Sequence, residues 1–359
     1  MFEFLNPKIC GFGIDLSDLS IKIANLKKAG DEFALTSFGR QEIKEGAIEQ
    51  GEIKKEDDLI AAIKKAVREI KGEPLKTKYC IVSLPETVSF IQMVKMPLMS
   101  RQELAEAIKW ELEAHIPLSR EEIYYDWQII EHPPSDPAGR QADHLDVLIG
   151  VLPKKTVDPY LEVLKKAGLK PFIFEIESVA TARALIKNGV APAPLMIVDF
   201  GAKRTGLFIF SGRTIFFTTS LPVSNTSLVE NLSKKLNISQ AKARQIKFKV
   251  GLDLGRRESD VFEALQLPMN ELAEKIQSYL DFYQEHGDAG NKISRILLCG
   301  GGANLADLPE FLSDNLKMPV EIGNPWVNIF QEPKEIPGLP SSEALAYTTA
   351  LGLALRGVS

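Results

Sequence analysis

The sequence contains one unit twice, and this repeat restricts the folds open to the chain more than any other feature. Residues 9–26 read ICGFGIDLSDLSIKIANL: an apolar run, an aspartate, a short polar tip and a second apolar run. Residues 195–219 read LMIVDFGAKRTGLFIFSGRTIFFTT and repeat this order, with Asp199 where the first unit has Asp15. Each unit is typical of a β-hairpin. The repeat therefore predicts a duplicated α/β fold with two lobes and a cleft between them.

The two aspartates predict where a ligand binds. Both follow an apolar strand directly, and ligands of open α/β sheets bind at the carboxyl ends of the strands. Either aspartate alone is equally typical of a plain hairpin, in which the carboxylate accepts hydrogen bonds from turn N–H groups. Because Asp15 and Asp199 occur at equivalent points of the two units, the repeat favours a shared ligand site.

Composition and charge exclude several function classes. The 359 residues suffice for two domains, and the net charge of -5 comes without a basic block, so no nucleic-acid binding is expected. No segment is long and apolar enough to predict a transmembrane helix. Three separated cysteines, Cys10, Cys80 and Cys299, predict buried, reduced thiols in a cytoplasmic protein. The chain lacks a Walker lysine loop and a Gly-x-Ser-x-Gly motif, so we predict no catalytic residues.

Several segments, in this order, resemble the actin-like ATPase superfamily and within it the PilM family of type IV pilus assembly proteins. They are GIDLSDLSIK at 13–22, VDFGAKRTG at 198–206, ILLCGGGANL at 296–305, PVEIGNPWVNI at 319–329 and AYTTALGLALRG at 346–357. The segment between the two hairpins also resembles the subdomain that this family inserts, called 1C in the related division protein FtsA. The resemblance implies a duplicated RNase H-like fold, with ATP and Mg²⁺ bound between the lobes.

The resemblance also implies domain boundaries. It assigns 1–85 and 169–192 to lobe 1A, 86–168 to the inserted subdomain 1C, 193–235 and 293–359 to lobe 2A, and 236–292 to a helical subdomain 2B.

The same resemblance assigns the nucleotide site. Asp15 and Asp199 are expected to face the metal ion, and Lys22 to reach the phosphates. The remaining cofactor-binding residues are expected in the first hairpin, the second hairpin, the helical block and the glycine triplet: Ser17, Asp18, Leu19, Ser20; Gly201, Thr205; Lys247; Gly300, Gly301, Gly302, Asn304.

Three departures from the family pattern bear on this site. Ser17 and Asp18 stand where the family has Gly-Ser, and Asp18 adds a negative charge beside the expected phosphates. Lys203 and Arg204 replace smaller residues, and their charge either compensates Asp18 or points to solvent. Arg244 stands where relatives carry a glutamate that accepts from ribose, and an arginine cannot accept a hydrogen bond.

The inserted segment predicts a binding surface and no catalytic constellation. Ser100 and Glu103 form a capping-box pattern that opens a helix, in which Leu104, Ile108, Leu112 and Trp110 are expected in the core. The resemblance implies that a groove beside this subdomain grips an N-terminal segment of the membrane protein PilN. The strand at 88–97 offers Ile91 and Met93 as the residues that line this groove.

We therefore predict a cytoplasmic ATP-binding scaffold, peripheral at the inner membrane, with slow ATP hydrolysis or none. The resemblance leaves other pilus platform proteins, the motor ATPase and self-association open as further interactions. One alternative is a true actin-like ATPase or sugar kinase, in which Glu175 or Glu177 positions the attacking group. Another is an FtsA-like division protein, which the absence of an amphipathic tail after ALRGVS disfavours. A third is a scaffold that binds no nucleotide.

Overall fold

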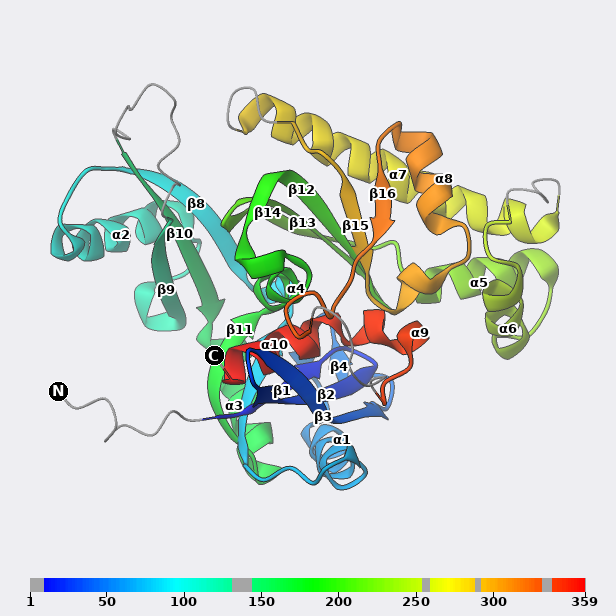
Figure 1. Cartoon of the computed structure of the whole chain (residues 1–359), viewed down its shortest axis with the longest axis horizontal. Helices are drawn as coiled ribbons and strands as arrows, with labels where there is room; N and C mark the ends of the chain where they lie inside the picture. The colour runs from blue at the N-terminus through cyan, green and yellow to red at the C-terminus, as the bar shows by residue number, and fades with distance from the viewer. Residues whose placement is uncertain (1–9, 131–143, 254–258, 288–291, 331–337, 359) are drawn as a thin grey trace.

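Two sheets form the framework of the molecule (Figure 1). The structure is a computed structural model, and it describes residues 10–130, 144–253, 259–287, 292–330 and 338–358. The first sheet has the strand order β11-β7-β1-β2-β3-β6. Its strands are β1 (Phe12–Leu16), β2 (Ser20–Ala29), β3 (Glu32–Glu42), β6 (Lys71–Gly72), β7 (Tyr79–Leu84) and β11 (Lys170–Ile176). The second sheet has the order β14-β13-β12-β15-β16. Its strands are β12 (Ala191–Phe200), β13 (Thr205–Gly212), β14 (Thr214–Leu221), β15 (Ile296–Cys299) and β16 (Val320–Ile322).

The two sheets repeat one topology, as the duplicated sequence unit predicts. In the first sheet, β1 pairs antiparallel with β2 and parallel with β7. In the second sheet, β12 pairs antiparallel with β13 and parallel with β15. Each central strand carries its aspartate as the second-last residue, Asp15 in β1 and Asp199 in β12. The predicted duplication is therefore confirmed, and both carboxylates lie at the carboxyl end of a central strand.

Helices cover both faces of the first sheet. The first sheet and these helices together are called the first lobe. α1 (Glu56–Arg68) and α3 (Lys154–Lys166) share one core cluster with β1, β2 and β7. On the other face, α10 (Thr348–Val358) packs so closely on β1 that a Cβ at Gly13 would lie 2.4 Å from the Ala350 carbonyl oxygen. Beside it, α4 (Glu177–Leu185) also contributes to a cluster with β12, β13 and β15. Thus α4 joins the two sheets.

The second sheet carries a helical block, and the two together are called the second lobe. Its helices are α5 (Asn225–Leu236), α6 (Gln240–Val250), α7 (Asp260–His286) and α8 (Leu308–Leu316). Three of them begin after a serine whose side chain accepts a hydrogen bond from the third backbone N–H of the helix: Ser224, Ser239 and Ser259. Short elements complete the two lobes: β4 (Ile48–Glu49), β5 (Glu52–Ile53) and α9 (Ser341–Ala344).

A small three-stranded sheet stands between β7 and α3 in the chain. Its strands are β8 (Phe90–Pro97), β9 (Ile123–Ile130) and β10 (His144–Pro153), in the order β8-β10-β9. One face packs against α2 (Arg101–His115), which begins with the predicted capping box of Ser100 and Glu103. The core prediction was wrong for Trp110, which is 73% exposed. Trp110 lies on the opposite side of the helix from Leu104, Ile108 and Leu112, because these three repeat every four residues and Trp110 does not.

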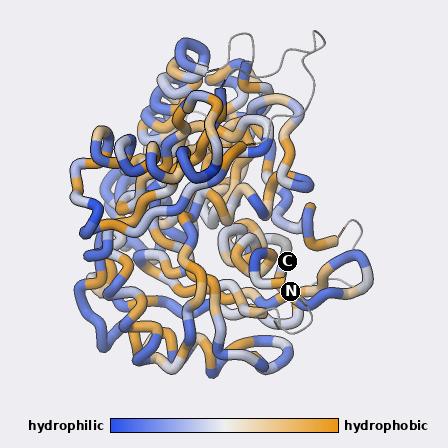
Figure 2. Tube along the Cα trace, turned by 90° about the vertical axis from the view of Figure 1, so that its left-hand side faces the viewer, coloured by the Kyte–Doolittle hydropathy of each residue, from blue (hydrophilic) through white to orange (hydrophobic). Residues whose placement is uncertain are grey.

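The cysteines and the hydropathy pattern complete the description. Cys80 and Cys299 are buried, whereas Cys10 is exposed because it precedes the first strand, so the prediction of burial was wrong there. Among the described residues, no helix has both the length and the apolar character that a membrane crossing requires. In the hydropathy-coloured trace of Figure 2, hydrophobic stretches are short and alternate with hydrophilic ones.

Candidate functional site

The first hairpin places a buried ion pair at the carboxyl end of β1. Asp15 and Lys22 are cross-strand partners, and the Lys22 ammonium donates to Asp15 Oδ2 at 2.8 Å. Ser83, at the end of the neighbouring parallel strand β7, donates its hydroxyl to Asp15 Oδ1 at 2.9 Å. The Asp15 carboxylate is thus held in place from two strands. It has the oxygen ligands that a hard cation such as Mg²⁺ prefers.

The tip of the first hairpin is closed by its own serines. The Ser17 backbone N–H and hydroxyl both donate to the Ser20 carbonyl oxygen at 3.0 Å. Neither Ser17 nor Asp18 takes a positive φ, so this turn forms without the glycine of the family pattern. Leu19 accepts the N–H of Ile43 through its carbonyl. Asp18 is buried, and its Oδ1 accepts the Gly51 N–H at 3.3 Å.

The second hairpin turns through residues 201–204 between β12 and β13. The turn is closed by the Gly201 N–H, which donates to the Arg204 carbonyl at 3.0 Å, and a Cβ at Gly201 would lie 2.6 Å from that same oxygen. Thr205 is fully buried, and its hydroxyl donates to the Val223 carbonyl at 2.7 Å. This bond ties β13 to the segment that leads into α5.

The glycine triplet packs directly against Asp199. Gly300 has a φ of +81°, and a Cβ there would lie 2.2 Å from Asp199 Oδ1. A Cβ at Gly302 would lie 2.7 Å from the ring of Phe200, whereas at Gly301 the nearest atom would be 3.6 Å away. Gly300 is therefore required both by its backbone conformation and by its contact with the carboxylate.

Arg204 and Lys203 cross from the second lobe to the first. Arg204 Nη1 donates to Asp18 Oδ2 at 3.1 Å, and Arg204 Nη2 lies 3.8 Å from Glu177 Oε1 at the start of α4. Lys203 pairs with Glu45 at 2.8 Å. Of the two roles that the sequence left open for Arg204, the compensation of Asp18 is therefore correct.

Two carboxyl groups near Arg204, those of Glu177 and Asp199, have raised pKa values. Burial raises the pKa of Glu177 to about 8, with Arg204 lowering it and Asp15 raising it. Burial likewise raises the pKa of Asp199 to about 6, against the lowering effect of Lys22. Two buried carboxyl groups with raised pKa values, close to further charged groups, mark a candidate site for a cation or for a ligand that carries one.

Glu86 was missed by the sequence analysis, although it contacts both lobes. Its carboxylate accepts from the hydroxyl of Ser178 at 3.0 Å in α4 and from the hydroxyl of Thr218 in β14. Burial raises its pKa. The signal was its place directly after β7, because β7 runs parallel to β1 and its carboxyl end lies at the same sheet edge as Asp15.

Lys247 lies apart from the carboxylates, on α6. It is only 2% exposed, and its ammonium donates to the side-chain oxygen of Asn225 at the start of α5. Burial lowers its pKa to about 8, and the exposed Arg244 lowers it further. The segment after α6 contacts the residues that follow the glycine triplet, because the Leu252 N–H donates to the Ala306 carbonyl at 3.0 Å.

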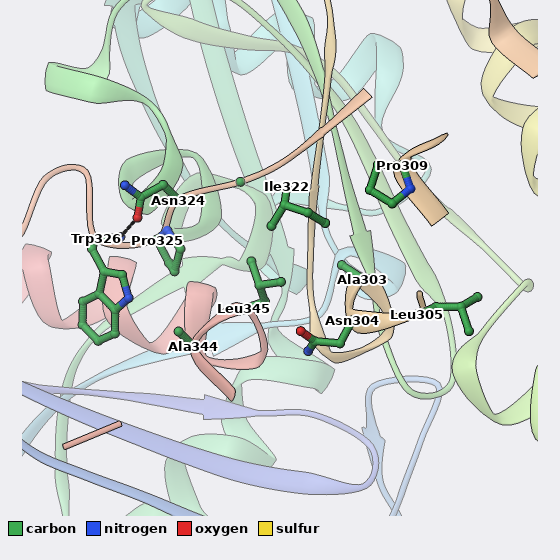
Figure 3. Close-up of a pocket in the computed structure, with 11 residues that line it drawn as sticks. Ala303, Asn304, Leu305, Pro309, Ile322, Asn324, Pro325, Trp326, Ala344 and Leu345 are labelled. Atoms are coloured by element: carbon green, nitrogen blue, oxygen red, sulfur yellow. Dashed lines mark hydrogen bonds between the residues drawn. The ribbon is translucent and has the colours of Figure 1, made fainter. Parts of the chain in front are cut away.

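Asn304 lines a cavity of about 440 Å³ next to the residues that follow the glycine triplet (Figure 3). Apolar side chains from β16, the loop after it and the segment from α9 form most of the wall, among them Ile322, Trp326 and Leu345. The sequence analysis did not identify these wall residues, which come from separate parts of the chain.

Ile91 and Met93 lie on β8, away from the carboxylates. Their neighbours Val94 and Met96 pack with α2, so alternation along the strand turns Ile91 and Met93 to the opposite face of the small sheet. Both are half-buried. Ile91 packs against the cluster that α4 forms with the second sheet, and Met93 stands opposite Leu148 of β10.

The structure thus brings most predicted site residues together in two groups. The two hairpins and the glycine triplet meet around Asp15, Asp18, Asp199 and Gly300. Asn304 follows the triplet, and Lys247 lies on α6, whose following segment bonds to Ala306. Ile91 and Met93 lie on β8, apart from both groups. Among the described residues, no three His, Cys, Asp or Glu side chains are arranged to hold a metal ion by themselves.

The chain matches the family model of type IV pilus assembly protein PilM over residues 13–358. Cell division protein FtsA of Helicobacter pylori is 27% identical over 137 residues, which are 37% of this chain and 28% of that protein. The chain thus aligns with about a quarter of the length of the curated relatives it matches, at 28% and 24%.

Solved structures show the fold. The PilM–PilN type IV pilus biogenesis complex matches with a TM-score of 0.79 and 22% identity, over 98% of this chain and all of that one (100%). MreB5 of Spiroplasma citri bound to ADP matches with a TM-score of 0.53 and 13% identity, over 96% and 94% of the two chains. The predicted actin-like fold is therefore confirmed.

Proposed function

Because the chain belongs to the PilM family of type IV pilus assembly proteins, we propose that it is an ATP-binding scaffold of the pilus platform at the cytoplasmic face of the inner membrane. The observation that carries the nucleotide part is the meeting of the two hairpins and the glycine triplet at equivalent strand ends. The solved structure of an actin-like relative, MreB5, has ADP bound.

The residues present fit ATP with magnesium. Gly300 lets the strand end of β15 pack directly against the Asp199 carboxylate, which keeps this carboxylate in place beside the second hairpin. Lys22 and Arg204 supply positive charge beside the phosphates, and Lys247 supplies it from α6. Magnesium in nucleotide sites uses one or two carboxylates together with phosphate oxygens and water. Asp15 and Asp199 are the candidates for these ligands.

We expect slow turnover or none. Glu175 is paired with Arg183 of α4, and Arg183 also donates to the Gly352 carbonyl of α10 at 3.0 Å. Glu175 therefore has a structural role: it holds the arginine that joins α4 to α10. Glu177 faces the cleft, but with a pKa of about 8 it is mostly protonated at neutral pH and a poor acceptor for a proton from water. The ATPase or sugar-kinase alternative is therefore disfavoured.

The partner-binding surface is proposed on the face of the small sheet that α2 does not cover. Met93 and Leu148 present half-buried apolar side chains there, and Gly150 adds none. A bound segment could insert apolar side chains against them. The solved complex of PilM with PilN supports PilN as the partner, and its N-terminal segment is the proposed occupant.

Calorimetry with Mg²⁺-ATP tests the nucleotide site. Wild type is expected to bind in the micromolar range and Asp199→Ala to lose binding. If folded wild-type protein does not bind Mg²⁺-ATP, the alternative of a scaffold that binds no nucleotide is the correct one.

A titration with a synthetic N-terminal peptide of PilN tests the peptide surface. Met93→Glu is expected to weaken binding at least about tenfold, because it buries a charge against an apolar partner. Gln92→Glu is the matched control: it adds the same charge to the same strand, but on the opposite face. Equal affinities of the two variants would contradict the assignment. Ile91 is less suitable, because it also packs against the second lobe.

A further inference from the structure

Asp18 of the first lobe holds Arg204 of the second lobe, and Glu177 lies beside the same guanidinium. The Arg204 guanidinium is bonded to Asp18 at 3.1 Å and lies 3.8 Å from Glu177. The Arg204 side chain is 16% exposed, and Asp18 is positioned by the Gly51 N–H, so this is a built contact of defined geometry. It differs from the neighbouring pair of Lys203 and Glu45, in which the carboxylate is largely exposed to water.

Arg204 can exchange its carboxylate partner for a phosphate group. Lys22 is paired with Asp15 inside the first lobe, so it compensates a different carboxylate. A polyphosphate in the cleft would meet the negative charge of Asp18 unless a cation lies between them. A guanidinium binds phosphate oxygens in the same forked, charge-assisted way as it binds carboxylates.

We propose that Arg204 is a phosphate ligand of the nucleotide site that Asp18 holds until a polyphosphate displaces it. The proposal rests on the proposed function, because it requires that the cleft binds a nucleotide. Binding exchanges the Asp18 contact for phosphate contacts at the same guanidinium. Asp18 therefore lowers the affinity for nucleotide, and the Ser17-Asp18 tip sets the concentration of ATP at which the site fills.

The same exchange couples the nucleotide to the contact between the lobes. Asp18 belongs to the first lobe and Arg204 to the second, so their ion pair joins the two hairpins. When phosphate oxygens bind the guanidinium, the direct contact between Asp18 and Arg204 is lost. The nucleotide then bridges the two lobes and holds them together instead of Asp18.

The test is calorimetry of Mg²⁺-ATP with two variants that should act in opposite directions. Asp18→Asn keeps the shape of the side chain and removes its charge, and is expected to tighten binding about fivefold or more. Arg204→Gln is expected to weaken binding about tenfold or more, since it removes a charge-assisted contact with phosphate. Lys203→Gln is the matched control and should change the affinity less than about twofold, because its partner Glu45 is exposed.

Thermal unfolding without nucleotide separates this role from a structural one. Both Asp18→Asn and Arg204→Gln should lower Tm by several degrees, because each leaves buried partners without their ion pair. A purely structural contact would lower Tm in both variants and change the affinity in the same direction, and this result would overturn the proposal.

Two further outcomes distinguish this proposal from the nucleotide site itself. If wild type binds Mg²⁺-ATP and Asp18→Asn does not tighten it, the proposed function stands and the role of Arg204 falls. If neither wild type nor Asp18→Asn binds, the nucleotide site falls, and the proposal falls with it.

Discussion

Lys247→Met should make the protein more stable and, at the same time, a weaker binder of ATP. Lys247 is 2% exposed, and burial depresses its pKa from 10.5 to about 8. The depressed pKa shows that the folded state disfavours the charged ammonium that the residue carries at neutral pH. Methionine has a similar length and no charge, so it can fill the same space.

The magnitude follows from the pKa shift. A change from 10.5 to about 8 corresponds to about 3 kcal/mol against the charged form. The variant loses the hydrogen bond to Asn225, about 1 kcal/mol, and the contact of the ammonium with the Phe248 ring at 4.7 Å, about 0.5 kcal/mol. We therefore expect Lys247→Met to raise the free energy of unfolding by about 1–2 kcal/mol at pH 7.

The pH dependence provides a second check on the sign. Between pH 8 and 10.5 the unfolded chain binds the Lys247 proton and the folded chain does not, so wild-type stability rises with pH in this window. The advantage of Lys247→Met should therefore shrink as the pH rises toward 10.5.

Urea denaturation at pH 7 and pH 9.5 measures both effects. Lys249→Met, an exposed lysine on the same helix, serves as the control and should change stability by less than about 0.5 kcal/mol. Calorimetry of the same variants should show weaker Mg²⁺-ATP binding for Lys247→Met alone. A Lys247→Met protein that is less stable than wild type at pH 7 would refute the argument from burial.

Three further predictions concern the fold and the cleft. Gly300→Ala should destabilise the protein by about 2 kcal/mol or more in denaturant titrations and weaken ATP binding, since its Cβ would overlap the Asp199 carboxylate; unchanged stability would contradict this close contact. Wild-type stability should fall as the pH rises from about 4.5 to 8, where folded Glu177 holds a proton that the unfolded chain releases; Glu177→Gln should remove on the order of 5 kcal/mol of this fall, and parallel pH profiles would rule the reasoning out. Trp110→Ala should cost less than about 0.5 kcal/mol and Ile108→Ala about 2–5 kcal/mol, and the reverse order would mean that the register of α2 is wrong.

The positions of candidate site residues were predictable where they depend on local sequence patterns. The positions of Asp15 and Asp199 were predictable from the repeated unit. In each unit the aspartate lies at the end of a strand, directly before a tight turn, and this determines where the carboxylate lies in its own sheet. Gly300 follows from the rule that close backbone approach needs glycine. Glu86 was not predictable in this way, since its partners Ser178 and Thr218 come from distant parts of the chain.

The sequence by itself determined the class of fold and its duplication. Periodic apolar runs select strands and helices locally, and the repeated unit forms the same antiparallel hairpin at the centre of each sheet. Only the tertiary structure decided the electrostatics of the cleft. From the sequence, Arg204 could face either solvent or Asp18. The pattern of a hairpin predicts the pairing of its own two strands, but not which residues of the other lobe it contacts. Packing of α4 between the sheets brings the two tips together, and that packing places Arg204 against Asp18 and Glu177.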